Sequence, residues 1–307
     1  MSQWKFWITC FRTWNAGGRS RPRFTRLACL VVFLPILLAV PVVASAAEKV
    51  TAKLFVSDAL TRPDRPVKLE ARLVQAGLFG HAGLGGEQLE FLVGGKKVGT
   101  ALTGGDGRGF FEYSPRMRGN LSLTVRLVES PRVKFVEGTG TLFSWERRRP
   151  ILLVESLSLM DDTKVPIVPL PPLAVGKTLP LSLTPAPDAA DELKRLTDFY
   201  FNVMYVVKQS GTGETEDLRQ WLQKHRFPPG PIVAIQNGGE ALATMIEGLR
   251  TDGWDNVKAG IGRTREFADV LVTRRLDVVI VPESDRGQLP KRAQIAKSWK
   301  EVRKKRL

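Results

Sequence analysis

Several acidic and polar side chains come shortly after apolar runs, where an α/β fold would gather them. Glu283 and Asp285 follow the run 278–281, and the polar residues 209–212 follow the run 203–207. Open parallel sheets bind ligands outside the carboxyl ends of their strands. Acids are also common there without a function. These groups are therefore candidates for a polar crevice that binds a ligand.

Other reactive side chains are scarce. Both cysteines, Cys10 and Cys29, fall within residues 1–46, so the rest of the chain has no disulfide, thiolate metal site or cysteine nucleophile. The two histidines, His81 and His225, are isolated, and they cannot form a three-ligand metal site without carboxylates. The glycine-rich stretch 77–86 lacks the Gly-Lys-Ser/Thr ending of a phosphate loop, which favours a flexible loop between strands.

Residues 1–46 have the three parts of a secretory signal. A basic lead over 1–26 is followed by the apolar run 27–43 and by the small residues Ala44-Ser45-Ala46. We therefore expect an exported protein that is periplasmic, envelope-associated or extracellular. The alternative is an uncleaved N-terminal membrane anchor, although Pro35 and Pro41 would weaken a spanning helix.

The positive charge is concentrated at the two ends of the chain. Residues 1–46 carry +6 of the formal net charge of +15, and residues 291–307 carry a further +7. Ile295, Trp299 and Val302 recur at helical spacing, which predicts a basic amphipathic helix over Lys291–Leu307. This helix would either dock on the protein or bind an anionic membrane surface or cell-wall polymer, with Trp299 inserting.

The rest of the chain is close to neutral, without the basic face and interleaved aromatics of a nucleic-acid-binding domain. No nucleic acid is therefore expected as a partner. The sequence does not identify a protein partner.

Residues 47–146 read as short alternating or apolar strands separated by turn-forming residues, which predicts a β-sandwich. The expected strands are 50–56, 67–74, 88–93, 109–113, 121–128 and 139–145. Gly94-Gly95-Lys96-Lys97 fits a tight hairpin turn. The run QLEFLVGGKKVGTALTGGDGRGFFEYSP resembles the central strands of bacterial immunoglobulin-like domains. This resemblance implies a spacer or adhesive module.

From residue 147 to residue 290, strands alternate with helices, which predicts an α/β domain with a parallel sheet in three layers. The expected strands are 151–154, 203–207, 232–235 and 278–281, and the expected helices are 188–201, 214–225, 240–249 and 264–275. A proline-rich insertion lies over 164–187.

The order of these elements, with Trp221-Leu222 leading through His225 to Gly230-Pro231, resembles the haloacid-dehalogenase-like (HAD-like, Rossmannoid) phosphatases. The nearest branch is the lipin-like and phosphatidate-phosphatase-like domains. The family uses a nucleophilic Asp after the first strand and an acid/base Asp two residues later. A Ser or Thr binds phosphate, a Lys neutralises it, and late acids complete a magnesium site.

The resemblance places altered residues at most of these positions. Glu155 falls at the nucleophile and Leu157 at the acid/base, whereas a slipped register offers Asp161 and Asp162 but puts Leu159 at the nucleophile. Neither register supplies the attacking aspartate.

At the remaining positions, Val207 replaces the phosphate-binding hydroxyl and Lys258 matches the lysine. Glu283 and Asp285, with Glu155, are the metal-ligand candidates.

One additional methylene in Glu155 displaces its carboxylate by about an ångström, a shift that can cost ~100-fold in rate. We therefore expect a pseudophosphatase without a cofactor, presented by the immunoglobulin-like domain and acting in binding or as structure. The alternative is a divergent Mg²⁺-dependent phosphatase acting on a phospholipid or another phosphoester.

Overall fold

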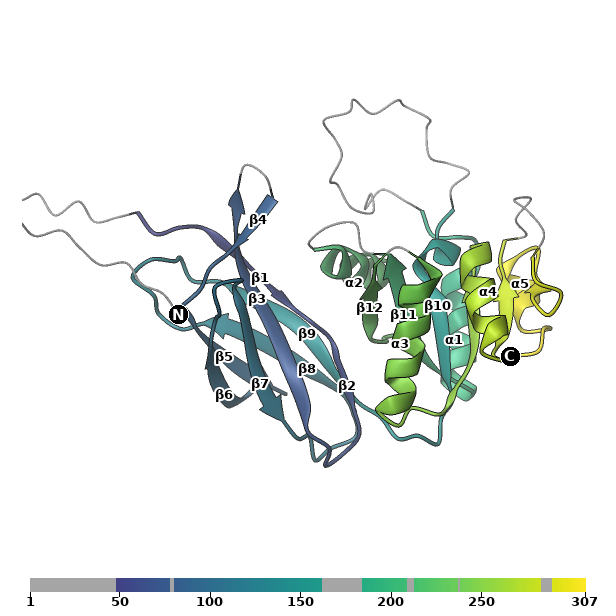
Figure 1. Ribbon diagram of the computed structural model, residues 1–307, viewed down its shortest axis with the longest axis horizontal. Coiled ribbons are helices and arrows are strands. Elements are labelled where there is room, and N and C mark those ends of the chain that lie inside the picture. Colours follow the sequence, from purple (N-terminus) through teal and green to yellow (C-terminus); the bar gives the residue numbers. More distant parts are fainter. Residues whose placement is uncertain (1–47, 78–79, 162–183, 209–212, 237, 283–288) are drawn as a thin grey trace, which may run out of the picture. The chain divides into compact units, whose positions relative to one another are not determined.

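A computed structural model describes residues 48–77, 80–161, 184–208, 213–236, 238–282 and 289–307. The chain divides into two units after Ala46, and all described residues belong to the second, Ala47–Leu307. This unit contains a β-sandwich and an α/β region (Figure 1). The predicted signal or anchor over 1–46 and the core of the proline-rich insertion lie outside the described residues.

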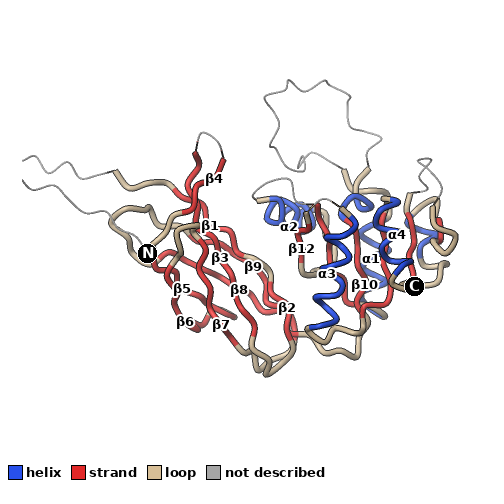
Figure 2. Tube along the Cα trace, in the orientation of Figure 1, coloured by secondary structure: helices blue, strands red, loops and turns tan. Residues whose placement is uncertain are grey.

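The sandwich consists of two sheets (Figure 2). Most neighbouring strands in them run antiparallel. In the first sheet, one edge of β3 pairs with β1, and the other edge pairs with β7 and β4. The bounds are β1 (Ala52–Val56), β3 (Val67–Gly77), β4 (Gly80–Gly83) and β7 (Arg108–Tyr113).

The second sheet has the order β2-β9-β8-β5-β6, in which only β2 and β9 run parallel. Its strands are β2 (Ala59–Thr61), β9 (Glu137–Ser144), β8 (Gly119–Leu127), β5 (Gln88–Val93) and β6 (Lys96–Leu102).

Alternation along the strands builds the sandwich core. Leu89 and Phe91 of β5 and Leu123 and Val125 of β8 are completely buried, while the residues between them face outward. The turn from β5 to β6 uses Gly94 and Gly95 at φ of 58° and 77°, values that favour glycine. The predicted sandwich is thus confirmed.

All six strands of the α/β region run parallel, in the order β12-β11-β10-β13-β14-β15. Their bounds are β10 (Ile151–Glu155), β11 (Asn202–Lys208), β12 (Ile232–Ile235), β13 (Val257–Gly262), β14 (Asp277–Ile280) and β15 (Gln294–Ile295). The chain starts at β10, proceeds to β12, and returns to the other side of β10. The switch point therefore lies between β10 and β13.

Helices cover both faces of this sheet. The helices are α1 (Ala189–Phe199), α2 (Glu214–Lys224), α3 (Gly239–Thr251), α4 (Arg265–Thr273) and α5 (Trp299–Val302), and a 3₁₀ turn spans Ser156–Leu159. Residues of α1, α2 and α5 pack on one face of the sheet, and residues of α3 and α4 pack on the other. Both faces of β10 are covered, which explains why its sequence is an unbroken apolar run.

The β-sandwich and the α/β region are joined by a common hydrophobic cluster and by an ion pair. Phe143 and Trp145 of the sandwich side belong to the same buried cluster as residues of α3 and α4. Asp58, which lies between β1 and β2, accepts a bond of 2.8 Å from Arg219 of α2 and one of 3.2 Å from the backbone nitrogen of Ile232.

Three expectations about the elements are wrong, and one strand was not predicted. Residues 291–307 do not form one helix, because Ile295 lies in β15 and only Trp299–Val302 is helical. The run ending at Val281 does not provide the last strand, because β15 pairs with β14. The glycine-rich stretch contains β4, which pairs with β3. β13, which no predicted strand covers, is central to the parallel sheet.

Candidate functional site

The carboxyl ends of β10 and β13 frame the switch point, the place where open α/β sheets bind ligands. Glu155 is the last residue of β10, and Gly262 is the last residue of β13. Arg263 and Thr264 then lead into α4. The sheet topology thus brings Glu155 to the amino end of a helix.

Glu155 is buried, with 4% of its surface exposed, and both of its carboxylate oxygens accept hydrogen bonds. Its Oε2 accepts from the backbone nitrogens of Arg263 and Thr264, at 2.8 and 2.9 Å. Its Oε1 accepts from the Thr264 hydroxyl at 2.6 Å. The Glu155 carboxylate therefore takes the place that an anionic ligand would take at this helix terminus.

Thr264 joins this carboxylate to the helix. Its Oγ1 accepts from the backbone nitrogen of Phe267 at 3.2 Å and thereby caps α4. The sequence pattern placed a helix start near Thr264, but nothing local indicated that Glu155, 109 residues earlier, would be its partner.

The rest of this edge is also internally paired. Lys208, the last residue of β11, contacts Glu266 Oε2 through its Nζ at 2.6 Å. Between these groups is a cavity of about 10 Å³, lined in part by Glu155, Lys208 and Glu266. A volume of ~10–15 Å³ holds a single water molecule. The sequence did not single out Lys208 or Glu266.

The structure also describes other positions that the resemblance singled out, namely Leu157, Asp161, Val207 and Lys258. Lys258 is the second residue of β13 and is exposed at its amino end, on the edge of the sheet opposite Glu155. The prediction that Lys258 occupies the position of the phosphate-neutralising lysine of the family is therefore wrong. Val207 is buried in the core on the α1 and α2 face, and Leu157 lies in the 3₁₀ turn. Asp161 follows that turn, and its backbone nitrogen bonds to Thr184.

Asp162, Glu283 and Asp285 lie outside the described residues, as do the polar residues 209–212. Within the described part of the chain, no group of three His, Cys, Asp or Glu side chains could hold a metal ion. The small cavity at the switch point is lined by the carboxylates of Glu155 and Glu266, and both have partners. Two of the three metal-ligand candidates thus lie outside the described residues, and both oxygens of the third, Glu155, are bonded to Arg263 and Thr264.

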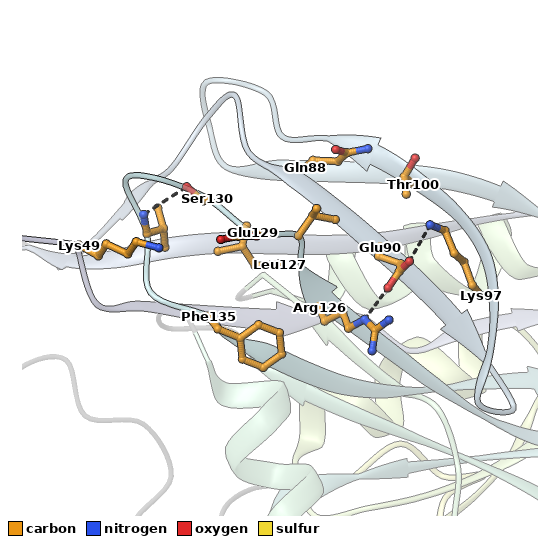
Figure 3. Close-up of a pocket in the computed structure, with 12 residues that line it drawn as sticks. Lys49, Gln88, Glu90, Lys97, Thr100, Arg126, Leu127, Glu129, Ser130 and Phe135 are labelled. Atoms are coloured by element: carbon orange, nitrogen blue, oxygen red, sulfur yellow. Dashed lines mark hydrogen bonds and ion pairs between the residues drawn. The ribbon is translucent and has the colours of Figure 1, made fainter.

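A larger pocket, of about 390 Å³, lies on the second sheet of the sandwich (Figure 3). Glu90 of β5 is at its floor, opposite Arg126 of β8 in the antiparallel register. The Glu90 carboxylate binds Lys97 Nζ at 2.7 Å and also the Nε of Arg126. These bonds, first that of Lys97 and then that of Arg126, hold the pKa of Glu90 below its usual value of 4.5.

The lowered pKa gives a testable acid dependence. Because the folded pKa lies below the unfolded one, the contribution of Glu90 to stability is present above pH 4.5 and is lost as the pH falls through the folded pKa. The difference in unfolding free energy between the wild type and Glu90→Gln should shrink over that interval. Urea unfolding at successive pH values measures it, and a difference that does not change with pH would contradict the pairing.

No protein-family model matches this sequence, and no curated protein matches it either. The solved structures that resemble it include small β-sandwich modules. The fibronectin(III)-like modules of CbhA from Clostridium thermocellum share 14% identity over 30% of this chain and 94% of that one, with a TM-score of 0.22.

A CARDB domain from Pyrococcus furiosus, in complex with di-metal ions, shares 13% identity over 32% of this chain and 91% of that one, with a TM-score of 0.25. A human PKD domain shares 15% sequence identity over 33% of this chain and 87% of that one, with a TM-score of 0.21. At these scores the likenesses carry no argument about function. The assignment of residues 48–145 as a β-sandwich rests on the strand order of its two sheets.

No helix among the described residues is both long enough and apolar enough to cross a membrane.

Proposed function

We propose that this chain is an exported protein of the cell envelope whose α/β region is a HAD-like phosphatase fold without catalysis. An immunoglobulin-like sandwich presents it, and the protein acts in binding or as structure. The observation that supports this proposal is the commitment of both Glu155 oxygens to Arg263 and Thr264.

A carboxylate nucleophile must direct a lone pair at phosphorus. Glu155 is buried against the start of α4, and its nearest cavity has room for about one water molecule. Lys208, a cation at this edge, is engaged by Glu266. The Glu155 carboxylate and the Lys208 ammonium are thus both bonded within the protein.

Phosphate release provides the test. The full chain, incubated with a generic phosphomonoester or phosphatidate and Mg²⁺, is expected to release no phosphate above the protein-free rate. Glu155→Gln, Asp161→Asn and the surface control Lys258→Ala should behave alike. Magnesium-dependent release that is abolished by Glu155→Gln or Asp161→Asn, but retained in Lys258→Ala, would overturn the proposal in favour of a divergent phosphatase.

We propose that the C-terminal segment, residues 291–307, binds an anionic membrane surface or cell-wall polymer through charge alone. Trp299 cannot insert as the sequence suggested, because it is 2% exposed and its indole nitrogen donates to the Ser158 carbonyl at 3.0 Å. Lys291, Lys297 and Lys304, in contrast, are exposed.

The double variant Lys291→Gln, Lys304→Gln should weaken binding to anionic vesicles by about 1 kcal/mol per lysine removed. The matched double variant Lys53→Gln, Lys96→Gln removes two exposed lysines of the sandwich and should bind like the wild type. Sedimentation with vesicles measures both. Equal losses in the two variants would mean that net charge, and not the C-terminal segment, determines binding.

A further inference from the structure

The pocket in Figure 3 has walls that are already in place without a ligand. Its floor is the outer face of β5, β6 and β8, whose inner face carries the sandwich core. One wall is the connection from β8 to β9. In this connection Ser130 Oγ accepts from the backbone nitrogens of Arg132 and Val133, at 3.1 and 3.2 Å, and Val133 bridges to Val50. A preformed wall lowers the ordering cost of binding.

Arg126 presents its guanidinium in a fixed orientation. Glu90 engages its Nε, and the other Glu90 oxygen is held by Lys97. Because Glu90 is bonded through the Nε of Arg126, the edge formed by the two terminal nitrogens makes no bond to Glu90, and the side chain remains 44% exposed (Figure 3). A guanidinium that a protein carboxylate already orients is suited to binding the carboxylate of a ligand through two parallel hydrogen bonds.

The remaining lining combines one aromatic ring with polar groups. Phe135 is 71% exposed at the edge of the pocket, so its ring is accessible to a ligand. Gln88 and Thr100 supply amide and hydroxyl groups. Besides Arg126 and Lys97, Lys49 adds a third cation, and Glu129 adds a second carboxylate beside Glu90. A volume of about 390 Å³ is within the range of small-ligand sites, ~300–1,000 Å³.

These features favour a sugar over a peptide. A peptide that adds to a sheet needs an unpaired strand edge. In the pocket floor β5 and β8 are each paired on both sides, and the unpaired edge belongs to β6. A ligand lying over β5 and β8 is therefore recognised by side chains. A sugar ring offers an apolar C–H face to Phe135 and hydroxyls to Gln88 and Thr100. A carboxylate on the ring would complement Arg126.

We propose that this pocket binds acidic sugar residues of an anionic polysaccharide, with Arg126 on the carboxylate and Phe135 on the face of the ring. The site belongs to the sandwich alone, and the proposal does not depend on whether the α/β region hydrolyses phosphoesters.

Isothermal titration calorimetry on the full chain tests this with tetragalacturonate. The neutral galactose tetramer and tetraglutamate serve as ligand controls. Tetragalacturonate should bind most tightly. Arg126→Gln and Phe135→Ala should each weaken it by about tenfold, and Arg126→Lys should also weaken it because lysine lacks the planar fork.

The control variants match the test residues in exposure and pairing. Arg108 of β7 is 45% exposed and pairs with Glu70, and Phe199 is exposed at the end of α1. Arg108→Gln, Phe199→Ala and the double variant Lys291→Gln, Lys304→Gln should retain the wild-type affinity. Because Phe135 is exposed, Phe135→Ala should fold normally, and an unchanged melting temperature would confirm this.

Three results would overturn the proposal. The first is no heat with tetragalacturonate, and the second is equal binding of tetraglutamate or of the neutral tetramer. The third is an affinity that survives Arg126→Gln and Phe135→Ala but is lost in the double lysine variant, which would place binding at the C-terminal segment.

Discussion

Replacing Arg219 by methionine is expected to lower the unfolding free energy by about 3–5 kcal/mol, because the change leaves a buried carboxylate without its cation. The Asp58 side chain is 2% exposed, and its Oδ1 accepts from Arg219 Nη2 at 2.8 Å and from the Thr141 nitrogen at 2.9 Å. Arg219 Nη2 also lies 3.3 Å from the Val56 carbonyl. Methionine would fill the space but donate nothing.

Chemical denaturation of the full chain measures this loss. The matched control is Arg250→Met on α3, which like Arg219 has a glutamate three residues earlier, Glu247 at 3.1 Å, but is 36% exposed. An exposed pair of this kind contributes about 0–1 kcal/mol. If Arg219→Met cost no more than Arg250→Met, the ion pair would not be an important link between the sandwich and the α/β region.

The same pair has a distinctive pH dependence. Burial raises the pKa of Asp58 above its usual value of 3.8, and this exceeds the opposing effects of Arg219 and of the Thr141 and Ile232 nitrogens. The folded state thus binds the proton more tightly than the unfolded state. The contribution of Asp58 to stability is full below pH 3.8 and is lost as the pH rises through the folded pKa.

Asp58→Asn removes this titration. The unfolding free energy of the wild type minus that of Asp58→Asn should therefore fall as the pH rises above 3.8. A difference that rises instead would mean that Arg219 outweighs burial.

Glu155→Ala is expected to lower the unfolding free energy by about 3 kcal/mol, the order of a lost set of charge-assisted hydrogen bonds. Truncation leaves the backbone nitrogens of Arg263 and Thr264 without their acceptor at the positive end of α4. Glu155→Gln should cost less, because its amide oxygen still accepts one of these bonds. Glu155→Asp should resemble alanine, since a side chain shorter by one methylene does not span the gap.

Urea denaturation, together with the amide NMR shifts of Arg263 and Thr264, measures these effects. Glu240→Ala, in the exposed first turn of α3, is the control and should change stability by less than about 0.5 kcal/mol. A Glu155→Ala protein as stable as the wild type, with unmoved amide shifts, would mean that the carboxylate does not hold α4. It would then remain available for chemistry.

The sequence by itself determined the elements whose signal is local. Leu89, Phe91 and Val93 recur at every second position because only one face of this strand is packed against the core. The apolar run of β10 is unbroken because helices cover both faces of that strand. Gly94-Gly95 specified its turn because few other residues adopt a positive φ. The sandwich and most of the parallel sheet followed from such patterns.

Only the tertiary structure decided what the reactive residues do. Glu155 was correctly expected at the end of a buried strand, but its partner Thr264 is distant in sequence and is brought close by the pairing of β10 with β13. Ile295 and Trp299 have helical spacing, yet the first pairs in β15 and the second packs in the core, because three apolar residues can satisfy either arrangement. Periodicity records which faces are buried, whereas hydrogen-bond partners depend on how distant segments meet.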